Sequence, residues 1–180
     1  FGKTGKLFAS DHMKTKPDII CLSKALTGGM VPMAITSCKE EIYEAFLSNE
    51  ISKGFFHCHT YSANPIACSA AIAVIELLKT ETIQKKIKEI AKMHSDFRKK
   101  ILRNKKVKSV SSLGVILSIE LKSEFGYYGN LRDKILSYFM SEGVFLRPLG
   151  NTIYIQPPYI IEKKQLNRIY KVIEKAIDEL

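Results

Sequence analysis

The sequence predicts an α/β protein made of two parts, an α/β part over residues 1–79 and a small α+β domain over residues 80–180. A length of 180 residues accommodates two such parts, and the 46% of hydrophobic residues is enough to fill a core. Short apolar runs broken by glycine dominate the first part, whereas long stretches with apolar residues at helical spacing dominate the second.

The first part begins with short strands. Residues 17–23, PDIICLS, predict a short buried strand, and residues 32–38, PMAITSC, predict a second one. Residues 39–48, KEEIYEAFLS, have an acidic start and apolar residues at helical spacing, which indicates a helix. A loop of residues 50–64 follows, and it is unusually rich in histidine and aromatic residues.

The remainder of the chain predicts helices and short strands. Asn64 is expected to cap a helix that has Pro65 at its first position and packs through small residues up to Lys79. The later elements follow apolar periods of 3.6 or 2 residues. They are expected as helices at 82–104, 131–143 and 162–180, a strand at 114–121, and a strand pair at 144–150 and 152–158 around a turn at Gly150 and Asn151.

The formal net charge of +10 allows nucleic acid, a membrane surface or an anionic substrate as partner. Most of the excess lies between Ile83 and Lys108, where lysine alternates with apolar residues at helical spacing. This pattern is typical of the solvated face of an amphipathic helix, and few aromatic residues accompany it. We therefore expect no nucleic-acid partner.

Cysteine usage and hydropathy predict a cytoplasmic protein with reduced thiols. No pair of cysteines has CxxC spacing, and no apolar run reaches the roughly 18–20 residues of a membrane span. The trio His57-Cys58-His59 lacks a spaced second pair that would complete a tetrahedral zinc site, so no metal is expected. The four cysteines are Cys21, Cys38, Cys58 and Cys68.

Lys24 is the first candidate for chemistry, in CLSKALTGG. It follows a predicted strand and has the apolar neighbours Leu22, Ala25 and Leu26, which disfavour the ammonium form and leave a free amine for attack on a carbonyl. Taken alone, the motif more often marks a surface lysine at a turn.

Three more residues have chemistry suited to a site. Thr60 precedes a helix N-terminus, where a hydroxyl and backbone N–H groups suit a phosphate, although an ordinary loop threonine has the same pattern. Arg147, fixed by Pro148, suits bidentate capture of a carboxylate or pairing with an internal acid. Tyr154 fits a substrate pocket or simple core packing.

Four stretches together resemble the class III pyridoxal-phosphate-dependent aminotransferases over nearly the whole chain. They are FGKTGKLFAS, KPDIICLSKALTGGMVPMAITS, FFHCHTYSANPIACSAAIAVIELL and GVFLRPLGNTIYIQPPYII. The resemblance implies fold type I, with residues 1–79 as the C-terminal part of the large cofactor-binding domain and residues 80–180 as the small C-terminal domain. Within the class, RPLGNTIYIQPPYII is similar to the biotin-pathway branch. That branch transfers the amino group of S-adenosylmethionine to 8-amino-7-oxononanoate.

The resemblance also implies roles for the candidate residues. Lys24 matches the lysine that bonds to the cofactor aldehyde and moves the substrate proton, and Thr60 matches a phosphate contact supplied across a homodimer. Cys58 and its neighbour His59 stand in the same loop, where relatives commonly carry glycine and proline, and Cys58 is expected to contact substrate. Arg147 matches the residue that binds the substrate carboxylate, and Tyr154 matches a tyrosine of the same pocket.

In that family FGKTG follows a stretch of the form Asp-Glu-x-x-x-Gly, whose aspartate pairs with the pyridine nitrogen of the cofactor. The 180 residues do not contain this stretch, so we expect them to be inactive alone and poorly soluble. Two alternatives remain from the sequence. One is another class III aminotransferase that uses an ω-amino acid or lysine as donor, and the other is a non-catalytic module that binds anions through its basic helix.

Overall fold

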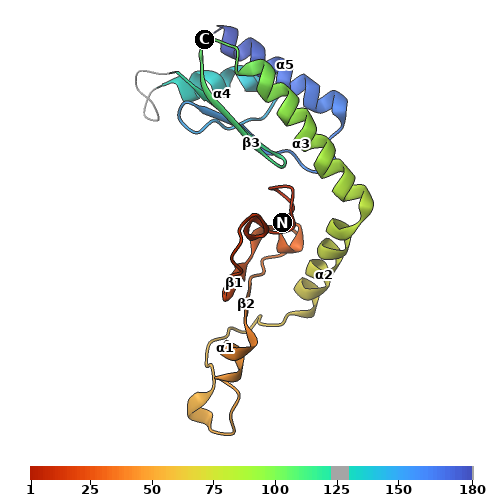
Figure 1. Cartoon of the computed structure of the whole chain (residues 1–180), viewed down its shortest axis with the longest axis vertical. Helices are drawn as coiled ribbons and strands as arrows, with labels where there is room; N and C mark the ends of the chain where they lie inside the picture. Colours follow the sequence, from red (N-terminus) through yellow and green to blue (C-terminus); the bar gives the residue numbers. More distant parts are fainter. Residues whose placement is uncertain (123–129, 180) are drawn as a thin grey trace. The chain divides into compact units, whose positions relative to one another are not determined.

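A computed structural model describes residues 1–122 and 130–179 of the chain (Figure 1). The chain divides into two compact units. The first unit contains Phe1 and Phe8–Thr80, and the second contains Gly2–Leu7 together with the chain from Glu81 onward. No helix among the described residues is both long enough and apolar enough to cross a membrane.

In the first unit, strands β1 (Ile19–Leu22) and β2 (Ile35–Cys38) form an antiparallel pair in which Ile19 faces Cys38 and Leu22 faces Ile35. Both predicted strands are therefore present, but the burial expected for the first is wrong. Ile19 is 53% exposed, because two strands of four residues each bury little surface on their own.

The helices of the first unit are unequal in length. Helix α1 covers only Glu40–Glu44, half of the predicted length, whereas α2 covers Pro65–Lys79 as predicted. The expected cap of α2 is confirmed, because Asn64 Oδ1 accepts the N–H groups of Ile66 at 2.9 Å and Ala67 at 3.3 Å. Three short 3-10 turns complete the unit: η1 (Ala9–His12), η2 (Lys24–Thr27) and η3 (Ile51–Lys53).

The described residues of the second unit form a two-layer arrangement of three helices and a three-stranded antiparallel sheet of order β3-β4-β5. Its elements are α3 (Glu81–Ile101), β3 (Val107–Leu113), β4 (Ile116–Leu121), α4 (Leu131–Ser141), β5 (Thr152–Ile155) and α5 (Lys163–Glu179). Strand β3 was not expected from the sequence. The strand predicted at 144–150 is wrong, since this segment forms only a single bridge, from Leu149 to Thr152.

The core of the second unit lies between one face of the sheet and the three helices. Leu117, Ile119 and Leu121 alternate along β4 and are buried, which leaves Ser118 and Glu120 on the opposite face. Helix α3 buries five residues at helical spacing and exposes its lysines, so the solvated-face interpretation of the charge run is confirmed. These five are Ile87, Ile90, His94, Phe97 and Ile101.

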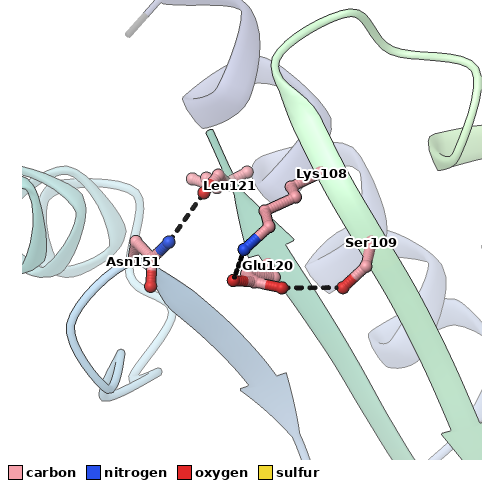
Figure 2. Close-up of polar contacts among 5 residues, drawn as sticks. All are labelled: Lys108, Ser109, Glu120, Leu121 and Asn151. Carbon is pink, nitrogen blue, oxygen red and sulfur yellow. Dashed lines mark hydrogen bonds and ion pairs between the residues drawn. The ribbon is translucent and has the colours of Figure 1, made fainter. Parts of the chain in front are cut away.

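A cluster of polar residues links β3, β4 and the turn before β5 (Figure 2). Glu120 accepts hydrogen bonds from Lys108 Nζ at 2.8 Å and from Ser109 Oγ at 2.9 Å, across the irregular register between β3 and β4. The hydrogen bond and the charge of Lys108, together with Ser109, lower the pKa of the Glu120 carboxyl. Asn151 Nδ2 donates to the Leu121 carbonyl at 2.7 Å, which fastens the tight turn before β5 to β4.

The segment Gly2–Leu7 belongs to the second unit through the turn between β3 and β4. The Val115 N–H group donates to the Lys3 carbonyl at 2.9 Å. Gly114 has a φ of +57°, and a Cβ atom there would lie 2.3 Å from the backbone carbon of Thr4. Only glycine allows this close approach, so Gly114 is required where residues 3–5 of the FGKTG motif pack against the turn between β3 and β4.

Candidate active site

Lys24 lies directly after β1, at the first position of the η2 turn, and its backbone has an unusual conformation. Its φ is +54°, which places a residue with a side chain in the left-handed region. Such a conformation costs on the order of 1 kcal/mol or more and persists only where surrounding contacts enforce it. Backbone strain of this kind is concentrated at functional sites, so the lysine is a candidate for chemistry on structural grounds.

The turn around Lys24 is fixed on both sides. Ser23 Oγ donates to the Met33 carbonyl at 3.2 Å, and Thr27 Oγ1 donates to the Val31 carbonyl at 2.5 Å. Leu26 and Thr27 are fully buried, and Gly28, at a φ of +64°, lets the turn approach α2 closely. The backbone is thus held while the Lys24 side chain stays exposed.

This exposure corrects one expectation. The apolar neighbours of Lys24 were expected to surround its amine, but within the first unit Leu26 turns inward while Lys24 and Ala25 face outward. Among the described residues, no acidic side chain forms an ion pair with Lys24.

A pocket of about 1060 Å³ in the first unit brings Lys24 together with the loop that precedes α2. Its apolar lining residues come mostly from the segment between η2 and β2 and from the start of α2, and further lining residues come from the loop of His59 to Asn64. The lining residues are Ser23, Lys24, Val31, Pro32, Met33, Ala34, Ile35, His59, Tyr61, Ser62, Ala63, Asn64, Ile66, Ala67 and Cys68.

The loop contains two of the predicted site residues. Thr60 is exposed and stands between His59 and Tyr61, which both line the pocket, just ahead of the α2 N-terminus. Cys58 is an exposed free thiol one position further from the pocket-lining residues. Within one chain, the pocket thus brings Lys24 near the loop that contains Thr60, although Thr60 itself does not line it.

The other two predicted residues belong to the second unit. Arg147 is exposed and lies outside any strand, between half-buried Leu146 and buried Pro148. Tyr154 is half-buried in β5 and pairs in register with Ser118, on the sheet face opposite the core. The side chain of Tyr154 is thus not core packing, which was the simpler interpretation of its sequence pattern.

Sequence reasoning gave no role to three of the polar residues that line the pocket, namely Ser23, His59 and Ser62. Their position beside Lys24 and Thr60 in the sequence was the available signal. Among residues 1–122 and 130–179, no group of three or more His, Cys, Asp or Glu side chains is placed to hold a metal ion.

Comparison with known proteins identifies the family to which the chain belongs. The family model described as "Aminotransferase class-III" matches residues 1–177. The chain belongs to the class III aminotransferases. It is 37% identical, over its whole length, to an adenosylmethionine-8-amino-7-oxononanoate aminotransferase of Synechococcus elongatus, of which it covers 42%. The enzyme of the same name from Methanocaldococcus jannaschii is 34% identical over 99% of this chain, which covers 41% of it.

Solved structures of class III aminotransferases share the fold, which confirms fold type I. The crystal structure of the Methanocaldococcus jannaschii enzyme aligns with a TM-score of 0.87 over 99% of this chain and 43% of that one. An acetylornithine aminotransferase from Elizabethkingia anophelis, 26% identical, aligns with a TM-score of 0.83 over 99% of this chain and 45% of that one. The chain thus spans about two fifths of the length of these relatives.

Class III aminotransferases work with pyridoxal phosphate, and an amine transaminase from an uncultivated Pseudomonas species, 25% identical, was solved in the pyridoxal-phosphate-bound form. The residues around the pocket fit this cofactor. Lys24 supplies a primary amine for an aldehyde, and His59 and Ser62 supply polar groups for an anion. No carboxylate is present among the described lining residues, and the apolar lining suits an aromatic ring.

Proposed function

We propose that this protein is an aminotransferase of biotin biosynthesis that transfers the amino group of S-adenosylmethionine to 8-amino-7-oxononanoate. The observation that carries the proposal is Lys24, which is held at a φ of +54° and lines a pocket together with residues of the loop before α2. The names of the relatives, at 31–37% identity over nearly the whole chain, support the substrate assignment.

Pyridoxal phosphate, when bound, supplies the electron sink that an amino-group transfer needs. The chain provides anchoring and proton transfer. The Lys24 Nζ amine would hold the cofactor through its aldehyde carbon and would move the proton at the substrate carbon. The exposed side chain on a fixed backbone allows both tasks, since only its rotatable bonds have to move.

The remaining residues bind and orient. Thr60 donates its hydroxyl to the cofactor phosphate, and Cys58 contacts substrate in the same loop. Arg147 binds the carboxylate of 8-amino-7-oxononanoate through two parallel hydrogen bonds, and Tyr154 contacts the same substrate. We propose further that two copies of the protein form a homodimer and that the Thr60 loop completes the site of the partner copy.

The 180 residues alone are proposed to be inactive. They contain no Asp-Glu-x-x-x-Gly stretch, so no aspartate of that motif holds the pyridine nitrogen in its protonated form. The exposed apolar side chains of the first unit, such as Ile51 and Phe56, 81% and 79% exposed, make the separate chain prone to association.

The amino donor is tested by absorbance on protein expressed from the complete gene and loaded with pyridoxal phosphate. Loss of the cofactor absorbance band on addition of S-adenosylmethionine, and not of lysine or an ω-amine, is expected. A response to lysine or an ω-amine alone would keep the class and reject the biotin assignment. A protein that takes up no cofactor would reject the aminotransferase proposal and favour an anion-binding module.

A further inference from the structure

We infer that Tyr159 is a positioning residue for the cofactor. It seats the loop Gly2–Leu7 in the second unit and thereby fixes the chain directly ahead of Phe1, where the family motif places the aspartate that pairs with the pyridine nitrogen. The inference rests on the proposed aminotransferase function. It adds a residue that acts on the cofactor through the backbone and not by direct contact.

The loop that Tyr159 contacts is closed at its base. The Gly2 N–H group donates to the Leu7 carbonyl at 3.0 Å. The residues on either side of the loop, Phe1 and Phe8, belong to the first unit, and their ring centroids lie 5.5 Å apart. The chain thus leaves the first unit for six residues only and returns beside its point of departure. Compact loops whose ends lie close together are frequently functional.

Tyr159 lies against the first two residues of this loop. Gly2 is buried at a φ of +72°, and a Cβ atom there would lie 2.9 Å from Tyr159 Oη and 3.2 Å from a terminal methyl group of Ile87. Lys3 Nζ lies 6.0 Å from the centroid of the Tyr159 ring, within the range of a cation–π interaction. Tyr159 therefore holds the loop by close packing at Gly2 and by electrostatic attraction at Lys3.

Backbone hydrogen bonds hold the loop from its other side. The Val115 N–H group donates to the Lys3 carbonyl at 2.9 Å, and the Val115 carbonyl accepts a hydrogen bond from Nε2 of the buried His94 at 3.0 Å. This side of the loop is thus tied to the core of the second unit. Tyr159 supplies the side-chain contact at the residue that directly follows Phe1.

The position of Gly2 determines where the chain ahead of Phe1 begins. Groups that contact a reacting molecule have to be held to within about 0.5 Å by the residues that support them. A displacement of about 1 Å that originates far from the chemistry can reduce a rate about a hundredfold. Loss of the Tyr159 ring is therefore expected to weaken the contact with the pyridine nitrogen and to leave the bond to Lys24 in place.

The experiment compares dissociation constants of pyridoxal phosphate and of its deaza analogue, in which a C–H group replaces the pyridine nitrogen, on protein expressed from the complete gene. Binding is followed by absorbance, without turnover. The wild type is expected to prefer pyridoxal phosphate, and Tyr159→Leu is expected to reduce this preference about tenfold, the range for a hydrogen bond to a charged group. Tyr138→Leu, which changes another half-buried tyrosine on the same core, is the control and is expected to keep the preference.

Further variants separate positioning from folding. Tyr159→Phe keeps the ring that faces Lys3, so it is expected to retain most of the preference. Gly2→Ala is expected to lose the preference, because its Cβ atom collides with Tyr159 Oη, and addition of Tyr159→Phe is expected to recover part of it. Trypsin cleavage after Lys3 is expected to be faster in Tyr159→Leu than in the wild type or in Tyr138→Leu.

Several outcomes would overturn the inference. An unchanged preference in Tyr159→Leu would reject it, and equal weakening of both ligands would show that Tyr159 only stabilises the fold. A wild type that binds both ligands equally through Lys24 would reject the inference and keep the proposed function. Failure of the wild type to bind pyridoxal phosphate would reject both.

Discussion

His94 is fully buried in the core of the second unit, and its two ring nitrogens both have partners. Nε2 donates to the Val115 carbonyl at 3.0 Å, and Nδ1 accepts the hydroxyl hydrogen of Tyr170 at 2.7 Å. This assignment of donor and acceptor is that of the neutral ring, which burial favours over the charged one. Burial lowers the pKa of His94 from 6.5 to about 4, against the opposing effect of the Val115 hydrogen bond.

This shift predicts a loss of stability in acid. In the unfolded chain His94 takes up a proton below its pKa of 6.5, whereas in the folded protein it does so only near pH 4. The free energy of unfolding is therefore highest above pH 6.5 and decreases as the pH falls from 6.5 toward 4. Each pKa unit corresponds to about 1.4 kcal/mol, so the free energy of unfolding is expected to fall by about 2 kcal/mol between about pH 7 and pH 5. Asp96 and Tyr170 are the other titratable groups that interact here, and Tyr170, whose pKa is raised by burial, stays neutral in this range.

The assay is urea unfolding at several pH values, followed by circular dichroism, in the wild type and in His94→Gln. Glutamine retains a donor and an acceptor but does not titrate. Between about pH 7 and pH 5, the free energy of unfolding of His94→Gln should therefore fall by about 2 kcal/mol less than that of the wild type. The other three histidines, His12, His57 and His59, are exposed and cancel in the comparison. Parallel pH profiles for the two proteins would refute the assignment of the shift to His94.

Three further predictions follow from particular contacts. Gly114→Ala is expected to cost roughly 2 kcal/mol or more of unfolding free energy and to expose Lys3 to proteases, because the new Cβ atom collides with the Thr4 backbone; unchanged urea and proteolysis profiles would contradict this. Asn64→Ala is expected to cost about 1 kcal/mol, and Asn64→Asp, which keeps the cap, should retain most of it in the same urea assay. Arg147→Lys is expected to raise KM for 8-amino-7-oxononanoate at least tenfold with an unchanged cofactor spectrum, and an unchanged KM would remove Arg147 from the carboxylate site.

Features that depend on interactions between residues close in the sequence could be predicted from the sequence. The cap at Asn64 and the helices α3 and α5 follow from short-range hydrogen bonding and from apolar periodicity, and they form where expected. Strand β3 was missed because a register irregularity after Val107 and a run of lysine and serine interrupt its alternation. The strand expected at 144–150 does not form, although its composition is apolar, since pairing depends on the partner strand.

Of the candidate site, too, only part could be predicted from the sequence. Lys24 could be singled out from its motif, but its left-handed backbone and its exposure depend on the anchoring of Ser23 and Thr27 to a segment up to ten residues away. The turn in which the Tyr61 N–H group donates to His59 Nδ1 could not be recognised from the sequence either. Such hydrogen bonds within a folded loop have no composition or spacing signature.

The central claim is that Lys24 bonds covalently to pyridoxal phosphate, and borohydride trapping followed by peptide mapping tests it most directly. Protein expressed from the complete gene is loaded with pyridoxal phosphate, reduced and digested. We expect one cofactor-modified peptide that contains Lys24, and no such adduct in a Lys24→Ala variant that is folded by circular dichroism. Modification at another lysine, or an equal adduct in Lys24→Ala, would contradict the account.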